Sequence, residues 1–351
     1  MPKLRKFGFG VIGVGTWGEN HVRAFTQNPD ANLIAIADVD ESRAQSIAKQ
    51  YGVKTYYTDY GDMLKDPEIE AVGVATPDYL HLQPCVAAAE AGKHILVEKP
   101  LATSVEDAEA ILNAAKRNNV KLMVDFHNRW NPSCVMAKES IEKGDIGEPL
   151  YLYARLNNTK LSPTGFLRWA SKSKVIWFLT VHTCDLARWF FKDEAERVYA
   201  VARSKVLEKM GIKTPDFYTA IVEFRRGAVT NFESCWIVPN TIPGVGWGRW
   251  QGLGVDFELE LVASEGAVYA NVVPNSVTRK YTDSYYTWPD IQGTFQLYKK
   301  WIGFGIESIN HFVDCVVNDK EPLVTGEDGL ATTKIICAME ESAKTGQIQI
   351  L

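Results

Sequence analysis

The segment HILVEKP, residues 94–100, places a carboxylate and an ammonium group directly after four residues that are typical of a buried strand. Such charges cost free energy unless they are paired or used. Free lysine has a pKa of about 10.4, and a lowering of about three units would let Lys99 take a proton from a hydroxyl group near neutral pH. Alternatively, Lys99 only pairs with Glu98 or with a phosphate group. The segment therefore predicts proton-transfer chemistry at Lys99.

A second group of reactive side chains lies on the predicted amphipathic helix 175–191. Helical spacing places His182 and Asp185 on one stripe with Phe178 and Trp189, which suits a ligand that has both hydroxyl groups and C–H faces. The alternative is a core histidine beside a surface pair of Asp185 with Arg188. No metal is predicted, because His182, Cys184 and Asp185 cannot converge from one helix.

Alternating elements must position these residues in the first half of the chain. Runs of Val, Ile, Leu and Ala predict strands buried on both faces, and helical patterns lie between them. This alternation predicts a doubly wound parallel sheet. The predicted strands are 7–13, 32–37, 71–75, 94–98 and 121–126, and the predicted helices are 17–27, 41–50, 79–91 and 104–118.

The glycine pattern GVGTWG, residues 13–18, follows the first predicted strand and opens the first helix. Alone it could be an ordinary turn, but Asp38 at the end of the second strand completes the context of a dinucleotide-binding fold. Asp38 would bind ribose hydroxyl groups and repel a 2′-phosphate, and Val39 offers no charge to hold one. Arg43 could still swing in. NAD is therefore favoured over NADP.

The carboxyl ends of parallel strands meet at one edge, where ligands bind. Thr76 and Pro77, with His81 one turn into the next helix, are expected at this edge beside Glu98 and Lys99. His21, inside the first helix, is predicted to be structural. The predicted cofactor-binding residues are Gly13, Gly15, Thr16, Trp17, Gly18, Asp38, Thr76, Pro77, His81, Glu98 and Lys99.

Beyond residue 126, Asn128 and Arg129 could line the nicotinamide pocket, or Arg129 could cap the domain junction. Strands at about 149–156, 197–203, 217–224, 228–236, 257–263 and 267–272 alternate polar and apolar residues, as antiparallel sheets do. Helices are expected around 305–317 and 328–344. The expected domains are residues 1–127 and 128–351. The glycine-rich loop 243–254 could be an active-site flap or an oligomer contact.

Together, the glycine pattern, TPDYLH, AGKHILVEKPLA and FHNRWNP make the chain resemble the Gfo/Idh/MocA oxidoreductases over nearly its whole length. The resemblance implies a Rossmann domain and a second α+β domain with a large, mostly antiparallel open sheet that forms homodimers or homotetramers. It also implies oxidation of a secondary alcohol of a sugar or cyclitol, or reduction of the ketone, with NAD(P).

The resemblance assigns the contact with the reacting hydroxyl group to Lys99. His182 matches the family's catalytic histidine, and Asp185 follows it at the family's spacing. Phe178 replaces the aspartate that usually orients this histidine, so a proton relay to such a carboxylate is not expected. The predicted catalytic residues are Lys99 and His182, and the predicted substrate-binding residues are Asp185, Lys99, Asn128 and Arg129.

Composition narrows the alternatives. A net charge of −5 argues against nucleic acid or an anionic membrane as a partner. The six scattered cysteines include no CxxC pair, which favours reduced thiols in the cytoplasm. The expected partner is a small polyhydroxylated substrate. An NAD-recycling glycosidase and a non-catalytic regulator that senses the cofactor remain as alternatives to a dehydrogenase.

Overall fold

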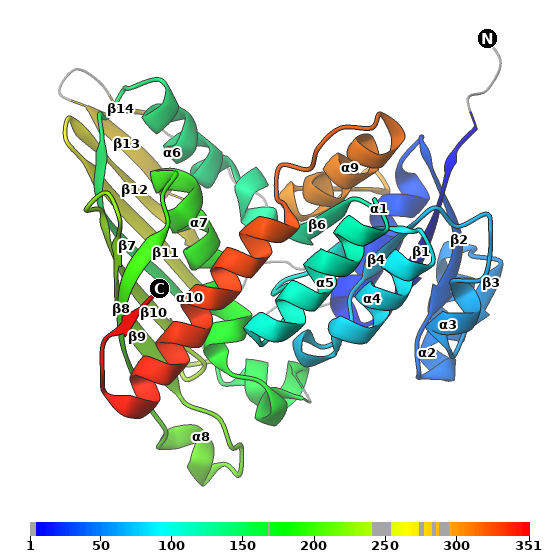
Figure 1. Ribbon diagram of the computed structural model, residues 1–351, viewed down its shortest axis with the longest axis horizontal. Coiled ribbons are helices and arrows are strands. Elements are labelled where there is room, and N and C mark those ends of the chain that lie inside the picture. Colours follow the sequence, from blue (N-terminus) through cyan, green and yellow to red (C-terminus); the bar gives the residue numbers. More distant parts are fainter. Residues whose placement is uncertain (1–4, 168, 241–253, 274–276, 283–285, 288–294) are drawn as a thin grey trace. The chain divides into compact units, whose positions relative to one another are not determined.

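The computed structural model describes the chain except residues 1–4, 168, 241–253, 274–276, 283–285 and 288–294 (Figure 1). The chain forms two compact units, residues 1–127 with 294–330 and residues 128–293 with 331–351. The sequence predicts one boundary, between 127 and 128. The segment 294–330 instead belongs with the first unit, because its apolar helix α9 (Phe304–Val317) packs against α1, β5 and β6 there.

The first unit is built on a parallel sheet with the order β3-β2-β1-β4-β5-β6 among its described residues. This confirms the predicted doubly wound fold. The strands are β1 Phe7–Ile12, β2 Ala31–Ala37, β3 Thr55–Tyr57, β4 Ala71–Val74, β5 His94–Glu98 and β6 Leu122–Asp125, with a hairpin of β15 Phe295–Leu297 and β16 Lys300–Ile302. The helices are α1 Thr16–Gln27, α2 Glu41–Tyr51, α3 Tyr60–Met63, α4 Leu82–Glu90, α5 Val105–Arg117 and α9, with 3₁₀ turns η1 Asp78–Leu80 and η2 His127–Trp130.

Helices cover both faces of this sheet. Phe9 of β1 stacks on Phe25 of α1 with ring centroids 4.4 Å apart, and it meets Phe312 of α9 at 6.4 Å. Both helices therefore lie on the face to which Phe9 points. Figure 1 shows α4 and α5 side by side over the sheet, where they pack against each other. Burial on both faces explains why the central strands are uninterrupted runs of apolar residues.

The register aligns the carboxyl ends of the central strands. Ile12 of β1 lies opposite both Ala37 of β2 and Val74 of β4. Val74 in turn lies opposite Val97 of β5. Glu98, the next residue, lies opposite Asp125 of β6. The segments that follow these strands consequently begin at one edge, as the sequence predicts.

The second unit contains a large mixed sheet with the order β14-β13-β12-β11-β7-β10-β9-β8-β17 in the described part of the chain. Only β10 and β7 pair in parallel among these strands, so the predicted mostly antiparallel sheet is confirmed. Burial alternates along β9, β10 and β11, as a sheet with one covered face requires.

The strands of this unit are β7 Pro149–Asn158, β8 Ala195–Arg203, β9 Phe217–Phe224, β10 Val229–Cys235, β11 Val255–Ala263, β12 Gly266–Val273, β13 Val277–Thr282, β14 Tyr286–Thr287 and β17 Gln349–Ile350. Its helices are α6 Pro132–Glu142, α7 Val181–Phe191 and α8 Val206–Lys209, with short turns η3 Ser162–Phe166, η4 Ala170–Lys172 and η5 Ile176–Thr180. The division between the units falls within α10 Gly326–Thr345. The predicted loop 243–254 lies almost entirely outside the described residues.

Across the described residues, no helix combines the length and the apolar character that crossing a bilayer requires.

Two glycines of the turn between β1 and α1 should differ in their tolerance of a side chain. A Cβ atom at Gly18 would lie 1.8 Å from the carbonyl oxygen of Gly13, whereas a Cβ atom at Gly15 would meet nothing within 4 Å. Gly18→Ala should lower the free energy of unfolding by about 1–3 kcal/mol, the usual cost of overpacking. Gly15→Ala should leave it nearly unchanged. Urea denaturation of both variants tests this, and equal stabilities would contradict it.

Candidate functional site

The glycine turn of the first unit has the features of a phosphate cradle. Gly13 has a φ of +83°, which suits glycine, and its N–H donates to the carbonyl oxygen of Ala37. Gly15 precedes α1 as its N-cap, where it provides no side-chain cap and leaves open space in the direction of a Cβ atom. The turn thus offers helix N–H groups and room for a pyrophosphate, so its residues fit a dinucleotide.

Asp38 lies directly after β2 and is held firmly beside this turn. Its Oδ2 accepts a hydrogen bond from the Val14 N–H at 3.0 Å, and its Oδ1 accepts one from the Asp40 N–H at 2.9 Å. Arg43 approaches both oxygens at 3.2 and 3.3 Å from a half-exposed position. The carboxylate is therefore fixed where a ribose would need an acceptor, which agrees with the fit of the glycine turn to a dinucleotide.

Lys99 follows β5 and is almost completely buried, with 5% of its surface exposed. Its peptide bond to Pro100 is cis. Burial lowers the pKa of Lys99 to about 8, against the opposing effects of the charges on Glu98, Asp78 and Asp125. An ammonium group with this pKa can release its proton close to neutral pH, as the sequence analysis requires of Lys99.

Glu98 points into a buried cluster with His21 of α1 and Asp125 of β6. Glu98 Oε1 lies 3.2 Å from His21 Nε2, and Asp125 Oδ2 lies 3.9 Å from the same nitrogen. Gly73 makes room for the ring, because a Cβ atom there would lie 2.3 Å from His21 Nδ1. Glu98 is therefore engaged within the domain, and its contact with the cofactor stays a prediction.

The two carboxyl groups of the cluster differ in acidity. Burial opposes ionisation of Glu98, but the hydrogen bond and the charge of His21 outweigh it and lower its pKa. Burial and the neighbouring Glu98 charge raise the pKa of Asp125 well above its usual range. One atom from each of His21, Glu98 and Asp125 could bind a metal ion, and these three atoms lie within 4.8 Å of one another. Glu98 Oε2 and Asp125 Oδ1 make no hydrogen bond in the described part of the chain, and the raised pKa of Asp125 favours a proton on the carboxyl pair over a cation, so we assign no metal here.

His81 contacts the backbone of two strand-end segments. Its Nδ1 lies 2.7 Å from the Pro100 carbonyl oxygen, and its Nε2 lies 3.0 Å from that of Thr76. A neutral imidazole has one N–H and donates to only one of them at a time. Burial lowers the pKa of His81 despite these acceptors. His81 thus braces the two segments, and its predicted contact with the cofactor stays a prediction.

Thr76, Pro77 and Lys99 do emerge at the same edge as the glycine turn, because β4 and β5 end in register with β1. The half-buried Thr76 hydroxyl oxygen makes no hydrogen bond within the structure described. His127 follows β6, and burial lowers its pKa to about 4. It is therefore neutral at physiological pH and stacks near Phe304, with ring centroids 5.9 Å apart.

In the second unit, Arg129 and Asp185 form a buried bidentate pair. Arg129 Nε lies 2.9 Å from Asp185 Oδ2, and its NH2 group lies 2.6 Å from Oδ1. Both side chains are at most 5% exposed, and the guanidinium group lies 5.8 Å from the Trp189 ring. The predicted alternative, a surface pair of Asp185 with Arg188, is wrong because Asp185 is buried and pairs with Arg129. Arg188 instead binds Glu194. The pair braces the interior of the unit, and the substrate contacts of Arg129 and Asp185 stay predictions.

The predicted helix 175–191 is not uniform. Residues 176–180 form a π-helical turn before α7 begins at Val181, so Phe178 does not continue the spacing of His182 and Asp185. Phe178 instead packs against Trp169 and Trp236, with ring centroids 6.2 and 6.0 Å apart. Aromatic packing thus replaces the carboxylate expected from the family pattern.

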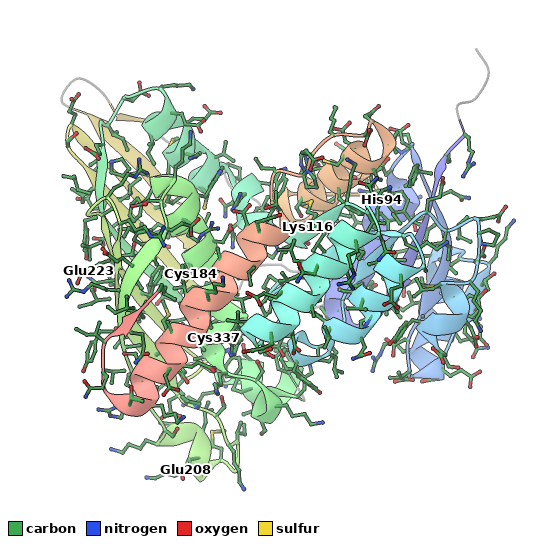
Figure 2. All side chains as sticks on the ribbon, in the orientation of Figure 1. His94, Lys116, Cys184, Glu208, Glu223 and Cys337 are labelled. Atoms are coloured by element: carbon green, nitrogen blue, oxygen red, sulfur yellow. The ribbon has the colours of Figure 1, made fainter. Side chains whose placement is uncertain are left out.

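His182 and Asn128 are both buried in the second unit. Cys184, labelled in Figure 2, lies on α7 between His182 and Asp185. Burial raises the pKa of its thiol well above the usual value, so it remains protonated. The catalytic role of His182 and the substrate contact of Asn128 stay predictions.

Asp125 is not among the site residues predicted from the sequence, and His21 is predicted there only as a structural residue. Two signals could have found them. His21 lies three residues beyond Gly18, on the second turn of α1, and Asp125 ends the strand next to the one that Glu98 ends. Only the register shows that the two acidic side chains are neighbours.

The Arg129–Asp185 pair should contribute strongly to stability. Asp185→Ala would leave the buried guanidinium group without its carboxylate, so we expect a loss of about 3–5 kcal/mol in the free energy of unfolding. Glu139→Ala, which removes the exposed Glu139–Lys143 pair on α6, is the matched control and should cost less than about 1 kcal/mol. Urea denaturation compares them, and a similar small loss in both variants would show that the buried pair is no brace.

Comparison with known proteins agrees with this geometry. Residues 7–126 match the oxidoreductase family with an NAD-binding Rossmann fold, and residues 134–269 match the GFO/IDH/MocA C-terminal domain. The chain is similar to a myo-inositol 2-dehydrogenase of Thermotoga maritima, with 29% identity over 91% of each chain. It is 27% identical to a scyllo-inositol 2-dehydrogenase (NAD⁺) of Bacillus subtilis, over 96% of this chain and 94% of the relative.

The fold is also similar to that of a solved structure. A crystal structure of a probable dehydrogenase from Thermotoga maritima superposes with a TM-score of 0.81 and 25% identity, over 98% of both chains. Both domains of the family are thus present, in the order and with the sheets described above. The chain belongs to the GFO/IDH/MocA oxidoreductase family.

Proposed function

We propose that this NAD-binding oxidoreductase transfers a hydride between a secondary alcohol of a sugar, sugar derivative or cyclitol and the nicotinamide, and that Lys99 handles the hydroxyl proton. The observation that carries the proposal is a buried lysine with a pKa of about 8 at the ligand-binding edge of the sheet. The inositol dehydrogenases among its relatives favour a cyclitol as the substrate.

The residues of the first unit have separate tasks in this proposal. NAD supplies the hydride acceptor when it is bound. The glycine turn and the N-terminus of α1 hold its pyrophosphate, and Asp38 accepts hydrogen bonds from its ribose. Neutral Lys99 bonds the substrate hydroxyl group and takes its proton. In the reverse direction, the Lys99 ammonium group returns that proton to the ketone oxygen.

The remaining features of the proposal come from the sequence. His182 assists Lys99 with the proton, without the carboxylate partner that Phe178 replaces. The protein assembles as a homodimer or homotetramer through the sheet of the second unit. A regulator that only senses NAD would need no lysine whose pKa lies near neutrality, so Lys99 favours the enzyme over that alternative.

The substrate is tested directly. Purified protein is incubated with NAD⁺ and myo-inositol, scyllo-inositol, aldoses or glycosides, and NADH formation is followed by absorbance. We expect turnover with at least one cyclitol or sugar. Hydrolysis of a glycoside without net NADH formation would favour the NAD-recycling glycosidase. Tight NAD binding without turnover of any compound would favour the regulator.

Lys99→Ala should lower kcat for alcohol oxidation by at least about a hundredfold while NAD⁺ affinity stays nearly unchanged, because Lys99 transfers the proton and the glycine turn holds the cofactor. In the unaltered enzyme, oxidation should rise with pH as Lys99 loses its proton around pH 8, and ketone reduction should fall. Steady-state kinetics and NAD⁺ titration measure these effects.

Lys93→Ala is the matched control, because it removes a buried lysine just before the other end of β5, where Nζ donates to the carbonyl oxygens of Asp66 and Ile69. It should leave kcat essentially unchanged. Full activity of Lys99→Ala would refute the proton-transfer role. Equal losses of NAD⁺ affinity and activity would make Lys99 a cofactor ligand.

Asp38 should set the preference for the cofactor. NAD⁺ should bind at least about tenfold more tightly than NADP⁺, which corresponds to about 1.4 kcal/mol, because the fixed carboxylate repels a 2′-phosphate. Asp38→Ala should narrow this gap. Asp40→Ala, which removes the neighbouring half-exposed carboxylate that also pairs with Arg43, should preserve it. Titrations with both cofactors decide, and equal affinities in the unaltered protein would reject this role of Asp38.

A further inference from the structure

The buried cluster of His21, Glu98 and Asp125 brings three titratable side chains together, and Glu98 directly precedes Lys99 in the sequence. Glu98 and Asp125 lie opposite each other on neighbouring parallel strands, so their side chains leave the sheet on the same side. His21 from α1 approaches both of them, and the Ser308 hydroxyl group of α9 bonds Asp125. All three members of the cluster are at most 5% exposed.

Two carboxylates this close cannot both be ionised away from water, because their repulsion and the loss of hydration act together. The hydrogen bonds decide which one keeps the charge. The N–H at His21 Nε2 points to Glu98, at 3.2 Å, and lies farther from Asp125, at 3.9 Å. Glu98 thus has the imidazole as a donor for its charged form. The Ser308 hydroxyl group also bonds Asp125, but burial and the Glu98 charge outweigh it, so the proton belongs on Asp125.

We infer that Asp125 carries a proton at neutral pH and donates it to the Glu98 carboxylate, so that the two carboxyl groups present one negative charge, and not two, to Lys99. Asp125 is therefore a positioning residue that acts on Lys99 through Glu98. The protonation of Asp125 stands by itself. Its effect on catalysis deepens the proposed function and rests on it.

The number of negative charges matters because Lys99 is surrounded by acidic groups. Glu98 from β5, Asp78 from η1 and Asp125 from β6 each favour its ammonium form. His127 from η2 also faces it and is neutral at physiological pH. A second full charge in the cluster would hold the proton on Lys99 more tightly and make it a poor base. The proton on Asp125 keeps Lys99 able to titrate near its working pH.

Infrared spectroscopy tests the proton without any substrate. Spectra of the full chain, with ¹³C-labelled aspartate carboxyl groups and in H₂O and D₂O, should show the carbonyl band of an un-ionised aspartic acid at neutral pH. The band should be absent in Asp125→Asn. It should remain in Glu19→Gln, a matched loss of a buried carboxylate that pairs with Arg23 on α1. A missing band in the unaltered protein, or a band that persists in Asp125→Asn, would overturn the inference.

The charge count is tested by titrating Lys99 in protein with ¹⁵N-labelled lysine, its NMR signal being assigned by its loss in Lys99→Ala. Asp125→Asn keeps the Glu98 charge and should move the Lys99 midpoint by less than about half a pH unit. The double variant Glu98→Gln with Asp125→Asn removes the charge and should lower the midpoint by about 1–3 units. Glu19→Gln should leave it in place.

Two outcomes would refute the charge count. One is a fall in the Lys99 midpoint in Asp125→Asn that is as large as in the double variant, which would mean that Asp125 itself is ionised in the unaltered protein. The other is an unchanged midpoint in a folded double variant. If the double variant does not fold, Glu98→Gln alone decides, because Asp125 should then take the charge and lose its infrared band. Neither method needs turnover, so a failure of the proposed function would be seen separately in the kinetic assays.

Discussion

The parallel register of the first sheet is the constraint on which the candidate site depends. Hydrogen bonding between neighbouring strands fixes Ile12, Val74 and Val97 at the same level, so the segments that follow them start at one edge. The three segments that follow β1, β4 and β5 are far apart in sequence, yet the backbone pairing alone brings them together. Because the strands are buried on both faces, any polar group beyond their ends is either partnered by protein or available to a ligand.

The same constraint creates an electrostatic problem that the fold must solve. The register brings Glu98 and Asp125 together in the interior, where two charges would repel each other. The repulsion is relieved in two ways. His21, which fits beside Gly73, donates a hydrogen bond to Glu98, and a proton on Asp125 removes the second charge next to Lys99. Burial of Lys99 destabilises its ammonium form. The same effect lowers its pKa to about 8, so that Lys99 can exchange a proton near neutral pH.

The second unit solves a different problem in a different way. One face of its sheet is covered and the other is exposed, so apolar and polar residues alternate along the strands. Charged groups inside the unit must pair with each other. Arg129 and Asp185 do so with bidentate geometry, which satisfies both groups where water is excluded. Around Phe178 the chain uses aromatic contacts and a π-helical turn where the family pattern has a carboxylate, so the surroundings of His182 differ from that pattern.

The sequence alone determined the order of elements, the doubly wound sheet, the glycine turn with Asp38 and the position of Lys99, because each is a local pattern of spacing, apolar runs or turn residues. The short strand β3 was missed, since three residues carry no detectable periodicity, and helix α6 and strands β13 and β17 of the second unit were missed as well. Only the tertiary structure decided the partners. Register joined Glu98 to Asp125, helix packing added His21, and the fold paired Arg129 with Asp185. Side-chain contacts between distant segments depend on register and packing, which local patterns do not contain.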